Sequence, residues 1–213
     1  MPSKNDSFAG KHREPMIRLA QLIRTLDYRS PDNNWRIGDT TDSTWGIGQS
    51  PQSAKNVFNF FRPNYAPPGS EISKKKLVTP EMQIVTETST ISQANYWYKL
   101  LNEPQRITKR KYSLVEKGKL RQHNLVDEET PGLSLFLEEE KSMAVNPSSL
   151  VERFDTLFSC GQLSKATKES IVESINKLPI DSNDSSARES YKKNRVIGAL
   201  LMVITNPEYI VLK

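Results

Sequence analysis

The amino-acid sequence predicts a mainly α-helical protein, an irregular helical domain with long ordered loops and little or no sheet. Two patterns support this prediction. In several segments the apolar residues recur at steps of three and four, which places them on one face of a helix. Long polar stretches separate these segments, and one of them combines prolines with aromatic rings. At 213 residues the chain is long enough to bury a core, and we expect one domain overall.

The first predicted helix covers residues 14–26. Pro15 suits its first turn, because the N–H group that proline lacks would have no partner there. The apolar residues of the segment recur at helical spacing, so one face of the helix is expected to enter the core. These residues are Met16, Leu19, Ala20, Ile23 and Leu26.

The most unusual stretch is residues 48–69, which we call the signature segment. It holds four of the chain's 13 prolines, and each proline fixes φ and removes a hydrogen-bond donor. Regular structure is therefore excluded from its second half. Exposing a large ring forfeits roughly 1.5–3 kcal/mol, so we expect an ordered loop that is packed against the protein. Its aromatic residues are Phe58, Phe60, Phe61 and Tyr65.

The next predicted helix covers residues 79–101, with Thr79 as N-cap and a proline in the first turn. Glu81, Thr88 and Asn95 are spaced by seven residues, close to two helical turns, so they are expected to line up on one side. Polar residues aligned within an apolar stripe predict a buried hydrogen-bond network or a wall that faces a ligand.

A charged excursion or linker is expected over residues 102–146, between an N-terminal part, residues 1–101, and a C-terminal part, residues 147–213. Charge is unevenly distributed here, since residues 106–121 carry seven basic side chains against one acid and acids follow at 127–129 and 138–140. Such a block is typical of a solvated surface, and we favour that interpretation. Nucleic-acid binding through residues 106–121 is the weaker alternative.

The C-terminal part predicts three helices, over residues 147–158, 164–177 and 184–205. Each has an apolar face, and a glycine or proline follows each one as a terminator. The last residues, 208–211, are expected either to pair as a short strand or to dock against the helices.

Several kinds of site are excluded by residue type and spacing. The single cysteine, Cys160, allows no intramolecular disulfide, and no spacing typical of zinc ligands or of a glycine-rich phosphate loop is present. We therefore expect no metal and no cofactor. No apolar run approaches the roughly 20 residues that cross a bilayer, and residues 1–14 lack the apolar stretch of a signal peptide.

Short motifs occur in a fixed order at residues 11–15, 48–51, 57–63 with Tyr65 and 67–69, 77–83, 161–164 and 206–209. Together they resemble the bacterial domain-of-unknown-function 1800 family (DUF1800), in its C-terminal portion. The resemblance implies a fragment of a longer protein, an exported or periplasmic location for full-length members, and a sulfatase-like protein from a neighbouring gene as partner. It implies no catalytic residues.

One polar constellation and the aromatic rings of the signature segment form the candidate site. We favour a structural network in which Arg62 or Arg13 neutralises Glu81. The alternative interpretation is a groove, floored by the rings, that binds a sugar or peptide. The leading hypothesis is a non-catalytic binding or assembly module of the bacterial cell envelope, and the alternative is a hydrolase of envelope carbohydrate with Glu81 as acid or base. The polar residues are Arg13, Glu14, Gln49, Asn59, Arg62, Glu81, Gln83, Thr88 and Asn95.

Overall fold

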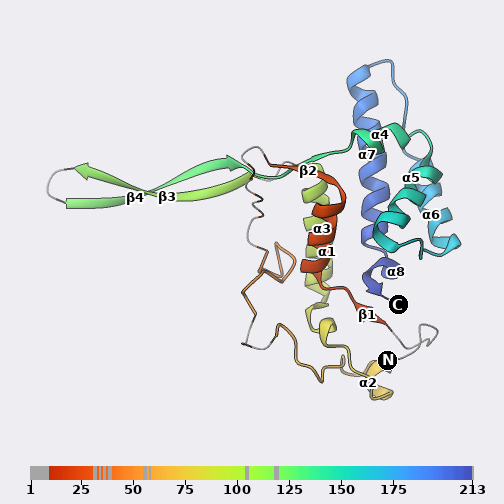
Figure 1. The fold of residues 1–213 in the computed structure, drawn as a ribbon, viewed down its shortest axis with the longest axis horizontal. Coiled ribbons are helices and arrows are strands. Elements are labelled where there is room, and N and C mark those ends of the chain that lie inside the picture. The colour runs from red at the N-terminus through yellow and green to blue at the C-terminus, as the bar shows by residue number, and fades with distance from the viewer. Residues whose placement is uncertain are drawn as a thin grey trace.

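The structure is a computed structural model in which helices predominate, so the mainly α-helical fold is confirmed (Figure 1). The strands among the residues that the structure describes form three two-stranded sheets. Among the described helices none is long and apolar enough to cross a membrane. The structure describes residues 10–30, 33, 35, 37, 40–54, 57, 59–103, 106–117 and 120–212, with the backbone alone for 106–117 and 120–131.

Three helices from different parts of the chain contribute to the core. Helix α1 (Pro15–Thr25) begins at the predicted proline and buries Leu22, and α3 (Glu87–Asn102) buries Trp97 against it. The longest described helix is α7 (Ser185–Ile204), and most of its second half is buried, with Met202 as an exposed exception. A single side chain on α1, that of Arg18, reaches both of the other helices by hydrogen bonds.

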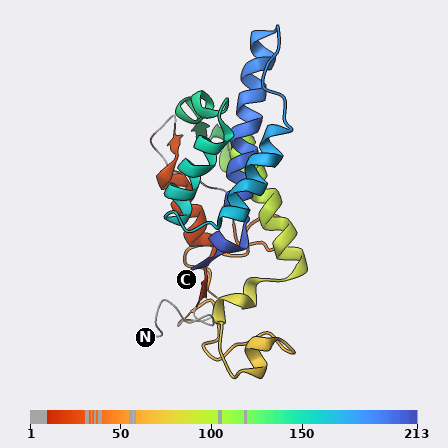
Figure 2. The same cartoon turned by 90° about the vertical axis from the view of Figure 1, so that its right-hand side faces the viewer.

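The predicted C-terminal helices are present. Helices α5 and α6 pack against each other and against α7 (Figure 2). Ser164 and Asp184 act as N-caps, and their side chains accept hydrogen bonds from the first-turn amides of α6 and α7. The π-helical turn η2 that extends α5 ends at Cys160, which has a left-handed φ of 55°. The bounds are α5 (Pro147–Phe154), η2 (Asp155–Ser159) and α6 (Lys165–Asn176).

The prediction of one continuous helix over residues 79–101 was wrong. A short 3-10 helix, η1 (Pro80–Ile84), comes first, and α3 starts afresh at Glu87. Thr86 causes the break, because its side chain accepts from the amide of Ser89 while the Ser89 hydroxyl accepts from the amide of Thr86. Because α3 starts afresh at this reciprocal cap, the directions of its side chains around the helix axis do not continue those of η1.

The charged excursion contains an element that the sequence analysis did not anticipate, a β-hairpin that projects away from the helices (Figure 1). Among the described strands, β3 (Arg106–Lys117) and β4 (Leu120–Pro131) pair with each other alone. The antiparallel register puts Lys109 opposite Glu128 and Arg110 opposite Asp127. Basic positions of β3 thus face acidic positions of β4, which accounts for the alternating charge blocks of the sequence.

The remaining elements connect distant parts of the chain. Strand β2 pairs with β5, which follows the hairpin and leads into α4. The strand expected over residues 208–211 is present only at Val211, which pairs together with Leu212 to a strand near the N-terminus, whereas residues 208–210 belong to a short helix. The bounds are β1 (Lys11–His12), β2 (Asp27–Arg29), α2 (Glu71–Lys74), β5 (Ser134–Phe136), α4 (Glu138–Met143), α8 (Pro207–Ile210) and β6 (Val211–Leu212).

Candidate functional site

The signature segment is attached to both α1 and η1. The fully buried Gln49 side chain donates to Glu14 Oε2 over 2.9 Å and accepts from the amide of Met16 over 3.2 Å. At Gly48, with φ of 76°, a Cβ would stand 3.2 Å from the side chain of Ile84 in η1. Glycine is therefore needed both for the turn and for the close approach.

The second half of the segment is held by hydrogen bonds to its backbone carbonyls. The amide of Thr79 donates to the carbonyl of Tyr65 over 2.7 Å. The Gln83 amide group donates to the carbonyl of Arg62 over 3.2 Å, so η1 fixes this part of the loop. These bonds explain how a segment rich in prolines keeps a defined path without regular structure.

A groove of about 360 Å³ lies between the signature segment and η1. Phe61 is buried, whereas Phe60 and Tyr65 are half-buried, and the Phe60 and Phe61 rings lie 6.2 Å apart. The exposed Arg62 guanidinium has no hydrogen-bond or ion-pair partner among the described residues. The groove thus combines rings with one available cation, and its lining is Gly48, Gln49, Phe60, Phe61, Arg62, Tyr65, Gln83 and Ile84.

Other residues of the predicted constellation lie outside this groove. Arg13 donates to Gln21 over 2.8 Å, and its guanidinium carbon lies 4.6 Å from the centre of the Tyr209 ring. Asn59 is exposed and accepts from the amide of Phe60. Phe58, which was expected in the aromatic floor, lies outside the described residues.

Glu81 takes a position that the sequence analysis did not foresee. Its carboxylate is buried, with 9% of the residue exposed, and it pairs with Lys11 over 3.1 Å rather than with Arg13 or Arg62. Thr88 and Asn95 are exposed on α3, because the break before that helix separates their phase from that of Glu81. The expected alignment of the three polar residues is therefore wrong.

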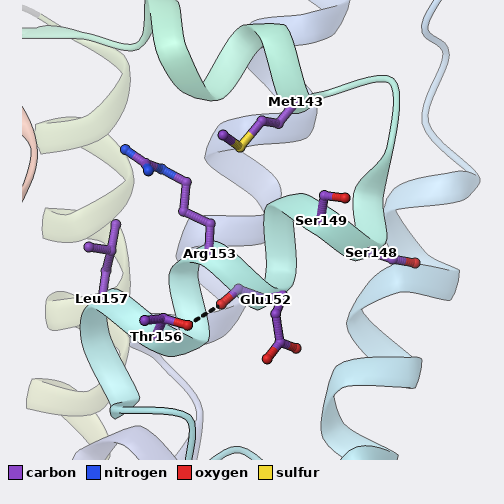
Figure 3. A pocket seen from close by; sticks show the side chains of 7 residues that line it. All are labelled: Met143, Ser148, Ser149, Glu152, Arg153, Thr156 and Leu157. Carbon is purple, nitrogen blue, oxygen red and sulfur yellow. Dashed lines mark hydrogen bonds between the residues drawn. The ribbon is translucent and has the colours of Figure 1, made fainter.

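A second hollow, of about 700 Å³, lies along the outer side of α5 (Figure 3). Its charged groups are paired within the protein: Arg153 contacts both Glu139 and Glu140, and Lys168 contacts Glu152. Thr156 donates to the carbonyl of Glu152, as the dashed line shows. Because its described charges already have partners, this hollow offers less than the groove to an incoming ligand.

Sequence reasoning missed a third cavity, which is lined by His12 and Arg18. Burial lowers the pKa of Arg18, and burial together with the Arg18 charge lowers the pKa of His12, although Glu81 opposes the latter effect. One signal was present in the sequence, since Arg18 stands directly before Leu19 and four residues before Leu22 in the apolar pattern of the first helix. A cation beside the core-facing stripe is uncommon unless it has a specific partner.

The comparisons with known proteins agree with the resemblance of the motifs. A family model described as a protein of unknown function (DUF1800) matches residues 2–211. No curated protein and no solved structure matches the chain. The matched range includes the signature segment, η1 and the C-terminal helices, so it spans every element that forms the groove. The chain belongs to the DUF1800 family.

Proposed function

We propose that this protein is a non-catalytic binding module that holds an acidic polymer, an anionic polysaccharide above all, in the groove of the signature segment. The observation that carries the proposal is the combination of half-buried rings with the exposed Arg62 guanidinium in one hollow. Aromatic faces pack against the apolar faces of sugar rings, and a guanidinium binds a carboxylate or sulfate in a fork of two hydrogen bonds.

The anchoring of the groove supports a binding role. Gln49 and Gln83 use their side chains to fix the loop to α1 and η1, so the rings are held in place before a ligand arrives. A site that is ordered in advance loses less conformational entropy on binding. The bacterial cell envelope, where anionic polysaccharides are abundant, is the location that we propose for this activity.

The arrangement of Glu81 favours binding over hydrolysis. A general acid or base has to reach the proton that it transfers, and a glycosidase needs a second carboxylate within roughly 5–10 Å. Glu81 is buried and paired with Lys11, and it does not line the groove. Turnover of glycosides or esters that Glu81→Gln abolishes would count decisively against the proposal.

The test is retention of the protein on polygalacturonate in affinity electrophoresis, with neutral dextran as the comparison polymer. We expect retention by polygalacturonate. Phe60→Ala, which removes a ring that packs on the sugar, and Arg62→Gln, which removes a charge-assisted hydrogen bond, should each weaken it about tenfold or more. Arg24→Gln is the matched control, because Arg24 is also exposed but lies on α1 outside the groove.

The control separates a site from general attraction, since a chain of charge +5 is drawn to any polyanion. If Arg24→Gln and Arg62→Gln weaken retention equally, binding is due to net charge and the proposed site is wrong. Equal retention on dextran and polygalacturonate would exclude the role of the Arg62 charge.

A further inference from the structure

A cavity of about 300 Å³ lies between β1, η1, α3 and the C-terminal elements. It shares no lining residue with the groove of the signature segment. Most of its wall is apolar, and the polar side chains that interrupt it are those of His12, Arg18, Thr90, Gln93 and Thr205. The apolar wall consists mainly of Met82, Val85, Ala94, Trp97, Ile210 and Val211.

Among the described residues of this wall, Arg18 alone is both charged and buried, with 4% of it exposed. Its guanidinium donates to Gln93 Oε1 over 3.2 Å and to the carbonyl of Ile204 over 2.7 Å. No carboxylate pairs with Arg18 among the residues that the structure describes. Its Nε has no hydrogen-bond partner there, and neither have Nε1 of Trp97 and Nδ1 of His12.

The contacts of Arg18 leave its charge partly uncompensated. Ile204 ends α7, and the carbonyls at a helix C-terminus carry only about half of an elementary negative charge. The rings of Trp97 and Tyr209, with centres 5.2 and 5.6 Å from the guanidinium carbon, supply a further weak attraction. A buried cation is costly unless an anion or a complete set of acceptors faces it.

The same fold contains a second buried arginine whose guanidinium nitrogens all have hydrogen-bond acceptors. Arg195 is 6% exposed, and its Nε and Nη2 donate to the carbonyl of Leu178 while Nη1 donates to that of Ala144. Acceptors thus meet all three of its nitrogens. Arg18, by contrast, lacks an acceptor at Nε and lines a cavity from which a ligand could supply one.

We propose that this cavity binds a small organic anion whose single carboxylate pairs with Arg18 and whose apolar body lies against Met82, Val85 and Ile210. The carboxylate supplies the missing acceptor and the missing charge, and the apolar wall accounts for the rest of the ligand. The size of the cavity fits an acyl chain of modest length better than a polymer.

Octanoate is the probe that tests this site. It is titrated into the full chain, and calorimetry measures binding while thermal unfolding measures stabilisation. We expect octanoate to bind and to raise the unfolding temperature with dose. We expect 1-octanol, which lacks the charge, and acetate, which lacks the apolar body, to bind about tenfold or more weakly.

Two variants locate the binding. Arg18→Met removes the cation, and we expect it to lower octanoate affinity by about tenfold or more. Ala94→Phe fills the cavity from an exposed position on α3, so it keeps Arg18 and the fold while abolishing the response to octanoate. Ala166→Phe, at an exposed position on α6, is the matched control that keeps the response.

The proposal is overturned if octanoate gives no response, if 1-octanol binds as tightly as octanoate, or if Ala94→Phe responds like the wild type. Should Arg18→Met fail to fold, the comparison of Ala94→Phe with Ala166→Phe decides the question alone. Because the cavity and the groove share no lining residue, one proposal can be wrong while the other remains correct.

Discussion

The side chain of Gln49 donates a hydrogen bond to the carboxylate of Glu14 over 2.9 Å, across 35 positions of the sequence. The same side chain accepts from the amide of Met16. Glu14 is the N-cap residue of α1, yet its own side chain makes no capping hydrogen bond. The signature segment therefore provides the cap for the first helix, and in return the helix holds the start of the segment.

Removing this connection is expected to destabilise the protein. Gln49 is fully buried, so Gln49→Ala leaves the Met16 amide and the Glu14 carboxylate without their partner, at a cost of about 1–3 kcal/mol. The free energy of unfolding in urea measures the loss. Gln162→Ala, at an exposed position, is the control and should change that free energy by less than about 0.5 kcal/mol. Equal stability of the two variants would contradict the capping role.

The depressed pKa of His12 predicts a pH dependence of stability. Burial lowers the pKa of His12 in the folded protein below its usual value near 6.5. In that range the unfolded chain binds the proton more readily, so the free energy of unfolding should fall as pH drops from about 7.5 through 6.5 and level off below the folded pKa. We expect His12→Gln to flatten this fall, as measured by urea unfolding at each pH. An unchanged slope would show that His12 is not responsible.

Glu81 is expected to act on His12 through its charge. The carboxylate raises the pKa of His12, so Glu81→Gln should lower that pKa further, which an NMR titration of the imidazole measures. Because Lys11 is largely exposed, the loss of the ion pair itself should cost no more than about 1 kcal/mol. Glu87→Gln removes a charge at an exposed position and serves as control. A rise of the His12 pKa in Glu81→Gln would refute this placement.

The hairpin is expected to be dispensable for folding. In the part of the chain that the structure describes, strands β3 and β4 pair only with each other, and Arg106 lies opposite Pro131 in the register. Replacing residues 107–130 by Asn-Gly should therefore close the ends with a tight turn and keep a cooperative transition. Circular dichroism during heating measures that transition, and its loss would mean that the hairpin supports the core. If the intact chain shows salt-sensitive retention on DNA that the shortened chain loses, the hypothesis of nucleic-acid binding through residues 106–121 is supported.

Local signals made most of the helices predictable. Pro15 marks the start of α1, and Ser164 and Asp184 mark the starts of α6 and α7, because caps and first-turn prolines act within a few residues of themselves. The break before α3 was missed although its cause is local. Thr86 and Ser89 cap each other with hydroxyl groups, whereas the familiar form of this cap has a glutamate or glutamine at the second position.

The candidate site was predictable only in part. Gln49, Arg62 and Gln83 meet in one groove, as the signature segment suggested, because that segment and η1 are near each other in the sequence. Arg18 was missed for the opposite reason. Its environment depends on Ile204 and on the pairing of β1 with β6, which connects positions about 200 residues apart. No periodicity or motif in a single sequence reports such a contact.

The measurement that tests the central proposal most directly is the mapping of oligogalacturonate onto the protein by amide chemical shifts in NMR. The proposed groove predicts that the largest changes fall on Phe60, Phe61, Tyr65 and Gln83 and disappear in Arg62→Gln. Changes concentrated in residues 106–121, with the groove unaffected, would contradict the proposal and assign the attraction to the basic strand of the hairpin.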